Sequence, residues 1–205
     1  MESAEFSQEQ RRILLNIARH AILSAVERGD LEQGGQGLTE GKPIPSFFDG
    51  PPPTGLSDER GVFTTLYLDR LLRGCVGYAV AVAPLYRAVA QTACAAAFQD
   101  SRFMPVTKDE ASRLEVSLSV LSRLFPISPE AIEVGRHGLI VTQGNRRGLL
   151  LPQVPVEHGW NRETFLEQVC RKAGLPVNAW RTGATIEAFT AEVFSDADST
   201  ATLRS

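Results

Sequence analysis

Residues 114–120 alternate strictly between apolar and polar side chains, and this pattern constrains the fold more than any other feature of the sequence. A period of two is that of a β-strand, whose successive side chains point to opposite faces of a sheet. We therefore expect a sheet with one face in the core. Its other face either lines a cleft or meets water, and it carries Glu115, Ser117 and Ser119.

Helix start signals and β-favouring runs surround this strand. Ser7 and Thr107 are each followed three residues later by Gln or Glu, which predicts a capping box at each helix start. The expected helices cover 7–29, 84–98, a short stretch after Thr107, and 161–174; the expected strands cover 62–68, 71–77, 114–120, 139–142, 149–151 and 185–194. This irregular order favours an α+β fold with a mainly antiparallel sheet over a doubly wound one.

The chain has 205 residues, which suits one domain with one substantial core. Residues 30–59 are rich in Gly and Pro and predict a long surface excursion. Residues 195–205 contain too few apolar side chains to pack, and we expect a disordered tail. Arg146 and Arg147 are expected in the loop of a hairpin, where their charge keeps a turn soluble.

Composition excludes several classes of function. The formal net charge of −3 argues against a general nucleic-acid binder, which needs clustered Lys and Arg in excess. The amino terminus lacks the pattern of a secretory signal, and the most apolar stretch, 76–85, is too short to span a bilayer. Three widely spaced cysteines indicate free thiols in a reducing compartment, so we expect a cytoplasmic protein. Its three histidines lack metal-like spacing, and no metal is expected.

Residues 71–77 offer a candidate thiol site. Strand alternation puts Arg73, Cys75 and Gly77 on one face. Arg73 and Cys75 then lie about 7 Å apart along the strand, and a unit charge there favours a thiolate by about 2 kcal/mol at an effective permittivity near 20. We therefore expect Arg73 to lower the pKa of the Cys75 thiol. Gly77 leaves unfilled space beside the sulfur, and both Gly74 and Gly77 allow close approach of backbone or of a ligand.

A purely structural interpretation explains the same residues. Cys75 would be a small buried hydrophobe, Arg73 would pair with a carboxylate, and the two glycines would mark a bulge or bend. The loop from Asp100 to Phe103 is similarly ambiguous: Asp100, Arg102 and Phe103 either contribute to a binding site or form a helix-end ion pair with the aromatic ring in the core. If the two polar faces meet, Glu115 holds Arg73 or acts as an acid or base.

Several motifs, taken in order, resemble one family. They are Gly61-Val62-Phe63-Thr64-Thr65-Leu66, Leu72-Arg73-Gly74-Cys75-Val76-Gly77, Asp100-Ser101-Arg102-Phe103 with Pro105, 114–121, Leu149-Leu150-Leu151-Pro152-Gln153-Val154, and His158-Gly159-Trp160. Together, over about residues 8–194, they resemble the AMMECR family, the AMME-syndrome candidate-region domain known in bacteria and archaea as AmmeMemoRadiSam system protein A. Val76 and Ser101 depart from the usual Ile and Pro of that pattern.

The resemblance implies a fold and partners. The fold is α+β in two unequal subdomains, with an antiparallel sheet flanked by helices and the cysteine motif beside a cleft between them. The implied partners are a Memo-like protein and a radical S-adenosylmethionine protein. No settled reaction is implied, and the sequence does not identify a cofactor.

Two functions follow as hypotheses. The first is a thiol-dependent enzyme or enzyme component, with Cys75 as nucleophile or ligand-contacting group, Arg73 holding an anionic substrate, and Glu115 or Asp100 in support. The second is a non-catalytic adaptor that binds the Memo-like or radical S-adenosylmethionine protein, with Arg73 and the 100–103 loop as contact residues. A role in RNA modification is a third, smaller alternative.

Overall fold

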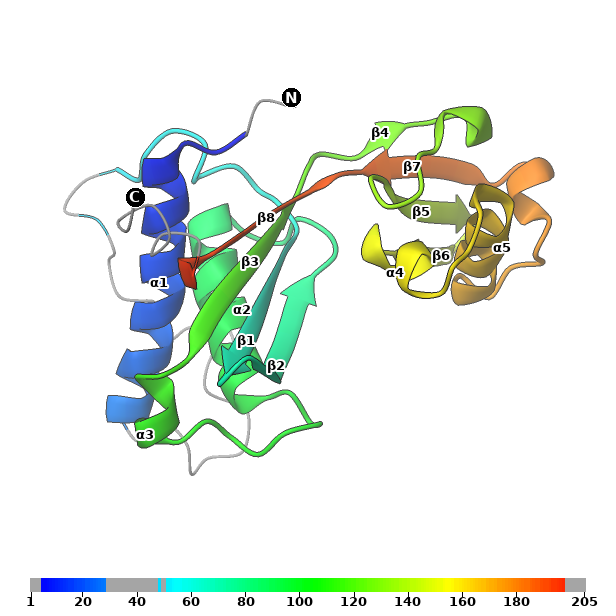
Figure 1. Ribbon diagram of the computed structural model, residues 1–205. Helices are drawn as coiled ribbons and strands as arrows, with labels where there is room; N and C mark the ends of the chain where they lie inside the picture. The colour runs from blue at the N-terminus through cyan, green and yellow to red at the C-terminus, as the bar shows by residue number, and fades with distance from the viewer. Residues whose placement is uncertain (1–4, 29–47, 49–50, 198–205) are drawn as a thin grey trace, which may run out of the picture. The chain divides into compact units, whose positions relative to one another are not determined.

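A computed structural model describes residues 5–28, 48 and 51–197, and the chain divides into two compact units (Figure 1). Unit 1 comprises residues 1–120 and 192–205, and unit 2 comprises residues 121–191. Each unit contains a four-stranded sheet of its own. The expected α+β fold with antiparallel sheets and two unequal parts is confirmed.

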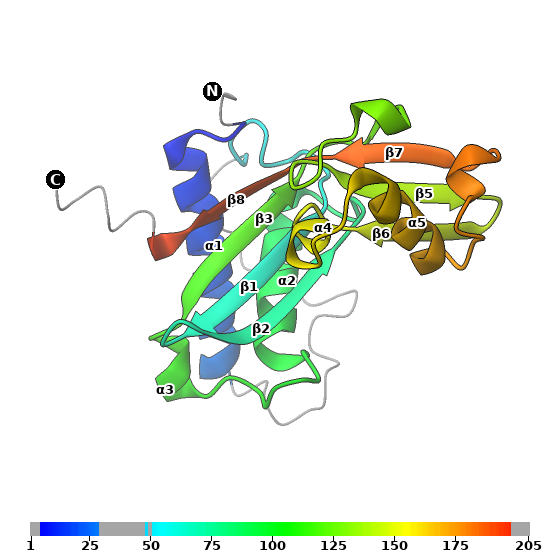
Figure 2. The same ribbon diagram turned by 45° about the vertical axis from the view of Figure 1, so that its right-hand side comes forward.

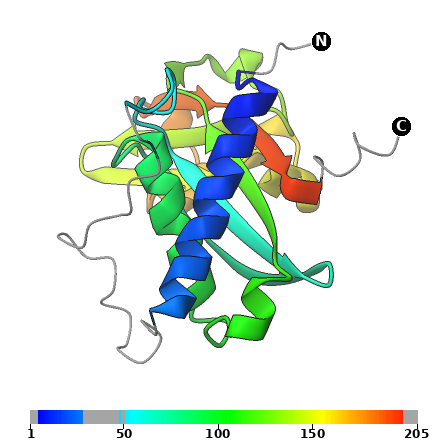
Figure 3. The ribbon, with the colours of Figure 1, turned by 90° about the vertical axis from the view of Figure 1, so that its left-hand side faces the viewer.

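The sheet of unit 1 has the strand order β2-β1-β3-β8, in which β1 is antiparallel to both β2 and β3. Helix α2 packs on β1 and β2, and α1 packs on α2, so one face of this sheet is covered by helices (Figures 2 and 3). The elements of this unit are α1 (Gln8–Glu27), β1 (Val62–Leu68), β2 (Leu71–Tyr78), α2 (Leu85–Phe98), α3 (Lys108–Ala111), β3 (Glu115–Leu121) and β8 (Ala191–Ser195).

Local sequence signals account for the start of both capped helices and for the faces of β3. Both predicted capping boxes are present, at Ser7 for α1 and at Thr107 for α3. In β3 the apolar side chains are buried, whereas Glu115, Ser117 and Ser119 are partly exposed. The alternation of β3 therefore orients the whole sheet, with one face toward α2 and the polar side chains on the other.

The hairpin of β1 and β2 contains a bulge that the alternation does not predict. Asp69 and Arg70 form a two-residue turn, with φ of 51° and 67°. The register then shifts, because Tyr67 faces Leu72 but Leu66 faces Gly74. Arg73 is the extra residue on β2, so its side chain does not follow the period-two pattern that was expected to put it on the face of Cys75.

The last predicted strand, 185–194, is in fact two strands in different sheets. Strand β7 (Thr185–Phe189) belongs to unit 2, and β8 begins two residues later in the sheet of unit 1. Thr190 separates them; its N–H donates to Ser122 Oγ at 3.0 Å, and its carbonyl accepts from Ser122 N–H at 2.9 Å. Strand periodicity continues through this break, which explains why the sequence predicts one strand.

Unit 2 has the sheet order β4-β7-β5-β6, with α5 packed on β5 and β6. Asn161 caps α5 as predicted, and Cys170 lies in the core of this unit. The hairpin turn is limited to Gly144 and Asn145, so Arg146 and Arg147 lie in β6 and not in a loop. The remaining elements are β4 (Phe125–Pro126), β5 (Gly138–Gln143), β6 (Arg146–Leu150), α4 (Gln153–Glu157) and α5 (Arg162–Lys172).

Two predicted irregular segments are only partly described. Most of the 30–59 excursion lies outside the described residues; within 51–59, Leu56 is fully buried in the core of unit 1, whereas the other residues are partly or fully exposed. The predicted tail begins too early, because Ser195 ends β8 and Asp196 accepts a hydrogen bond from Val116 N–H at 3.1 Å. Among the described helices, none is long and apolar enough to cross a membrane.

Candidate functional site

Cys75 is the one cysteine of the three that is partly exposed; Cys94 is 5% exposed and Cys170 is fully buried. It lies in β2 opposite Thr65 of β1, and Thr65 lies opposite Ser117 of β3. These three side chains form a row across the polar face of the sheet. The Thr65 hydroxyl donates a hydrogen bond to the Cys75 sulfur at 3.3 Å.

The backbone of Cys75 is held from the outer edge of the sheet. Cys75 N–H donates to Asp100 Oδ2 at 2.8 Å, and its carbonyl accepts from Arg102 Nη2 at 3.5 Å. Because β2 is an edge strand, these two groups would otherwise be unpaired. Asp100 and Arg102 therefore take the place that a further strand would occupy, and they fix the position from which the thiol projects.

Asp100 and Arg102 form the ion pair that the structural interpretation predicted for the end of α2. Arg102 Nε donates to Asp100 Oδ1 at 2.9 Å, and Arg102 Nη2 donates to Oδ2 at 2.7 Å. The Arg102 guanidinium, with the N–H groups of Cys75 and Arg102, holds the pKa of the Asp100 carboxyl well below its usual range, although burial of Asp100 opposes the shift. Phe103 packs beneath Arg102, with 5.4 Å between guanidinium carbon and ring centroid.

Arg73 pairs with a carboxylate, as the structural interpretation predicted, but the sequence did not identify Glu110 as the partner. Its Nε and Nη2 donate to the two carboxylate oxygens of Glu110 in α3, at 3.0 and 3.1 Å. Nη1 donates to the carbonyl of Met104 at 2.8 Å, and Nη2 also reaches that of Pro105 at 3.3 Å. The side chain of Arg73 is 14% exposed. Its charge is neutralised by Glu110, so the expected roles of activating the thiol and of holding a substrate are not supported.

Glu110 is stabilised in its charged form by the same contacts. The Arg73 guanidinium, with Thr107 N–H and hydroxyl, lowers the pKa of Glu110 to about 2 against the opposing effect of burial. Thr107 N–H donates to Glu110 Oε2 at 2.8 Å within the capping box. One carboxylate therefore both caps α3 and anchors the bulge of β2.

Neighbouring groups occupy the space beside the two glycines of the motif, so neither position is open. A Cβ at Gly77 would lie 2.3 Å from the Phe63 ring, so this ring occupies the space expected beside the sulfur. A Cβ at Gly74 would lie 2.1 Å from the carbonyl oxygen of Ala96, because α2 packs directly on β2 there. Both glycines therefore have packing roles, whereas the structural interpretation expected them to mark a bulge or bend; the bulge lies at Arg73, next to Gly74.

Of the other predicted site residues, Ser117 lies in the row of Cys75, and Glu115 does not contact Arg73. Glu115 lies opposite Tyr67 at the far end of the polar face, while Arg73 is held by Glu110. Within the described residues, no group of three or more His, Cys, Asp or Glu side chains is arranged to bind a metal.

The structure adds three residues to the predicted site. Thr65 contacts the sulfur, Phe63 covers Gly77, and Glu110 immobilises Arg73. The sequence predicted Glu110 only as part of a helix capping box, and it predicted Phe63 and Thr65 only as strand residues. Their roles depend on register, which the bulge at Arg73 determines.

The fold and this site define a class: an α+β protein in two units, with a thiol on the polar face of one antiparallel sheet, held at the sheet edge by an ion pair. A family model, AMMECR1, matches residues 15–194, and the chain belongs to this family.

Relatives and one solved structure agree with this assignment. The chain is 39% identical over 199 residues to Protein MK0488 of Methanopyrus kandleri, covering 92% of this chain and 89% of the relative. It is 43% identical over 149 residues to a protein of Aquifex aeolicus, covering 68% of this chain and 76% of the relative. The crystal structure of uncharacterized protein PH0010 from Pyrococcus horikoshii has 38% identity and a TM-score of 0.67, with 89% of each chain covered.

Proposed function

We propose that this chain is a thiol-dependent enzyme or enzyme component that acts on a small or anionic substrate at Cys75. The observation that carries the proposal is the combination of a partly exposed sulfur, a hydroxyl donor from Thr65, and a backbone held at both polar groups by Asp100 and Arg102. A fixed sulfur that already accepts a hydrogen bond is suited to act as thiolate, because the same donor stabilises its charge.

Among the described residues of unit 1, no histidine lies beside the Cys75 thiol. The one histidine of unit 1, His20, lies in α1 on the helical side of the sheet and contacts Ser24 at 3.4 Å. Within unit 1, Cys75 would therefore act as a nucleophile whose proton goes to solvent or to the substrate, or as a ligand-contacting group.

Alkylation of the three cysteines against pH, followed by peptide mass spectrometry, tests this proposal. We expect Cys75 to react fastest, because Cys94 and Cys170 are buried and burial raises the pKa of the Cys170 thiol. A Cys75 that reacts no faster than the buried pair would rule the proposal out.

Thr65→Val provides a matched variant, since it removes the hydroxyl and keeps the shape of the side chain. We expect the alkylation rate of Cys75 at neutral pH to fall relative to that of Cys94, because the variant loses the hydroxyl that contacts the sulfur. An unchanged relative rate would leave the Thr65 contact without a role at the sulfur.

An adaptor function is the second candidate, and one observation favours it. Leu71 is 74% exposed and Met104 is 81% exposed, and the contact of Arg73 with the Met104 carbonyl brings their two segments together. Exposed apolar side chains of this size are typical of protein interfaces. The proposed partners are a Memo-like protein and a radical S-adenosylmethionine protein.

Leu71→Asp and Met104→Asp test the adaptor function, because both change exposed side chains and leave the Arg73–Glu110 pair intact. Calorimetric titration with each partner should show at least tenfold weaker binding for both variants, with Val193→Asp, at an exposed position of β8, as control. Full-strength binding by both variants would reject this surface.

A further inference from the structure

The two arginines of the candidate site differ in how many of their guanidinium nitrogens donate hydrogen bonds within the protein. Arg73 uses all three nitrogens, on Glu110 and on the carbonyls of Met104 and Pro105, and is mostly buried. Arg102 uses only Nε and Nη2. Its Nη1 has no partner among the described residues, and its side chain is 56% exposed. Two N–H donors of Arg102 are therefore available to a ligand.

Arg102 is also held in one orientation. Asp100, which is 6% exposed, accepts from two guanidinium nitrogens, and the Phe103 ring lies against the guanidinium plane. When a carboxylate already holds one edge of a planar guanidinium, the group loses little conformational freedom as an anion binds its other edge. An ordinary surface arginine lacks this preorganisation.

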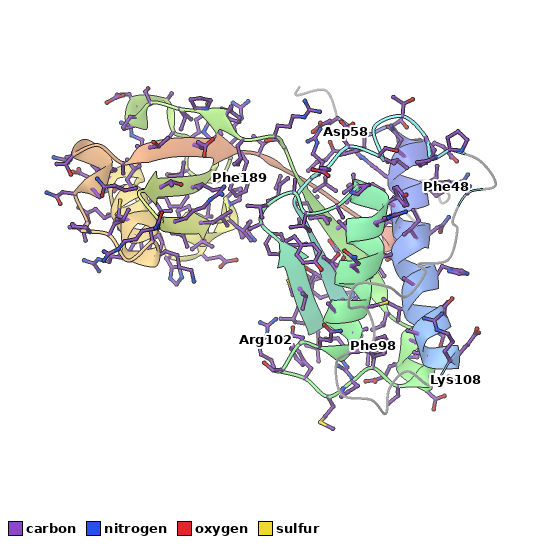
Figure 4. The ribbon with its side chains drawn as sticks, turned by 180° about the vertical axis from the view of Figure 1, so that it is seen from behind. Phe48, Asp58, Phe98, Arg102, Lys108 and Phe189 are labelled. Carbon is purple, nitrogen blue, oxygen red and sulfur yellow. The ribbon has the colours of Figure 1, made fainter. Side chains whose placement is uncertain are left out.

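The same carboxylate that orients Arg102 also holds Cys75. Asp100 Oδ2 accepts both from Arg102 Nη2 at 2.7 Å and from Cys75 N–H at 2.8 Å. The cation and the thiol residue are thus fixed relative to each other through one buried group. Figure 4 shows the side chain of Arg102 beside the edge strand, away from Lys108 at the end of the helical layer.

We infer that Arg102, through Nη1, receives the anionic group of the ligand whose reacting or contacted atom lies at the Cys75 sulfur. This inference rests on the proposed thiol function and deepens it, since it assigns the anion-binding role to Arg102 and not to Arg73. The ligand class is a small molecule with a carboxylate or phosphate a few bonds from the atom that meets the thiol.

A pair of alkylating agents that differ in charge tests the inference. In each reaction the Cys75 thiolate attacks the methylene carbon, a C–S bond forms, the C–I bond breaks, iodide leaves, and the thiol proton goes to solvent. Iodoacetate carries a carboxylate beside the reacting carbon, and iodoacetamide carries a neutral amide. The ratio of their rate constants at Cys75 therefore measures recognition of the anion apart from reactivity of the thiol.

Arg102→Gln removes the guanidinium, and Arg113→Gln is the matched control. Arg113 is 58% exposed, lies in the same unit, and also pairs with an aspartate, Asp69. We expect Arg102→Gln to lower the iodoacetate-to-iodoacetamide ratio at Cys75 by about fivefold or more, and Arg113→Gln to leave it unchanged. Equal ratios in wild type and Arg102→Gln would overturn the inference, as would an equal loss in both variants.

Competition on the unchanged protein removes any dependence on how Arg102→Gln folds. Acetate or inorganic phosphate should lower the ratio at Cys75 more than sodium chloride at the same ionic strength does, and the more effective ion indicates the ligand's anionic group. Equal effects of all three salts would overturn the inference. If Cys75 reacts with neither reagent, the proposed function itself fails; a Cys75 that reacts well with iodoacetamide and shows no preference for the anion refutes the role of Arg102 alone.

Discussion

Replacing Glu110 by Gln should destabilise unit 1 in a way that depends on pH. Gln retains the capping-box geometry but removes the negative charge that faces Arg73. Because the pKa of Glu110 is lowered from 4.5 to about 2, the charge contributes stability above pH 4.5, and this contribution disappears as pH falls through about 2.

The size of the effect follows from that pKa. At about 1.4 kcal/mol for each pH unit, the lowered pKa corresponds to an upper limit of about 3 kcal/mol. The Arg73 and Glu110 side chains are 14% and 24% exposed, so solvent screening reduces this, and we expect about 1–2 kcal/mol at neutral pH. The stability gap between wild type and Glu110→Gln should be constant above about pH 5.5 and should close between pH 4.5 and 2.

Hydrogen exchange followed by mass spectrometry is the appropriate assay, since the two units need not unfold together. Peptides covering β2 and α3 should lose protection in Glu110→Gln, and peptides from α5 serve as an internal reference. Asp109→Asn, on the same helix but exposed, should change stability by less than about 0.5 kcal/mol. A gap that stays constant down to pH 2, or an equal loss in Asp109→Asn, would refute the assigned role of the Arg73–Glu110 pair.

Three further substitutions test the packing. Gly74→Ala should destabilise unit 1 by about 1–3 kcal/mol in urea unfolding followed by circular dichroism, because its Cβ meets the Ala96 carbonyl; an unchanged midpoint would contradict this. Asn161→Ala should lower the free energy of unfolding of unit 2 by about 1 kcal/mol, measured by tryptophan fluorescence, because the Asn161 side chain caps α5. Asn161→Asp, which keeps a capping oxygen, should lower it by less. Phe63→Ala should speed iodoacetamide labelling of Cys75 by opening the space over Gly77, and an unchanged rate would show that the ring does not limit access.

The elements with strong local signals could be predicted from the sequence. The prediction of the site was wrong where it depended on the register between β1 and β2. Both capping boxes and the β3 pattern depend on residues a few positions apart, and their interactions are local. Cys75 differs in this respect. Counting back from the two-residue turn puts Thr64 opposite Cys75, but the bulge at Arg73 moves Thr65 into that position, and Thr64 faces the core instead. Gly74 is the one local signal for a bulge, and it does not show which residue of β2 is extra.

The charged partners of Arg73 and Cys75 could not be predicted from the sequence either, for a related reason. Arg73 and Glu110 are 37 residues apart, and Cys75 and Asp100 are 25 apart, so their contacts depend on where α2 returns the chain. An electrostatic calculation along the strand considers only the nearest charge in sequence, Arg73. The actual neighbours of Cys75 come from the loop after α2, whose two opposite charges the sequence did identify as a candidate site.

The break between β7 and β8 has a consequence for how the molecule is made. Strand β8 is the final strand of the first unit, yet a ribosome reaches it only after the whole of the second unit, 121–191, has been synthesised. Until then β3 lacks its outer neighbour, and the partners of Arg11 and Arg19, Glu192 and Asp196, do not yet exist. Unit 2 is therefore an insertion within unit 1, and the thiol-bearing sheet is completed only after unit 2 has been synthesised.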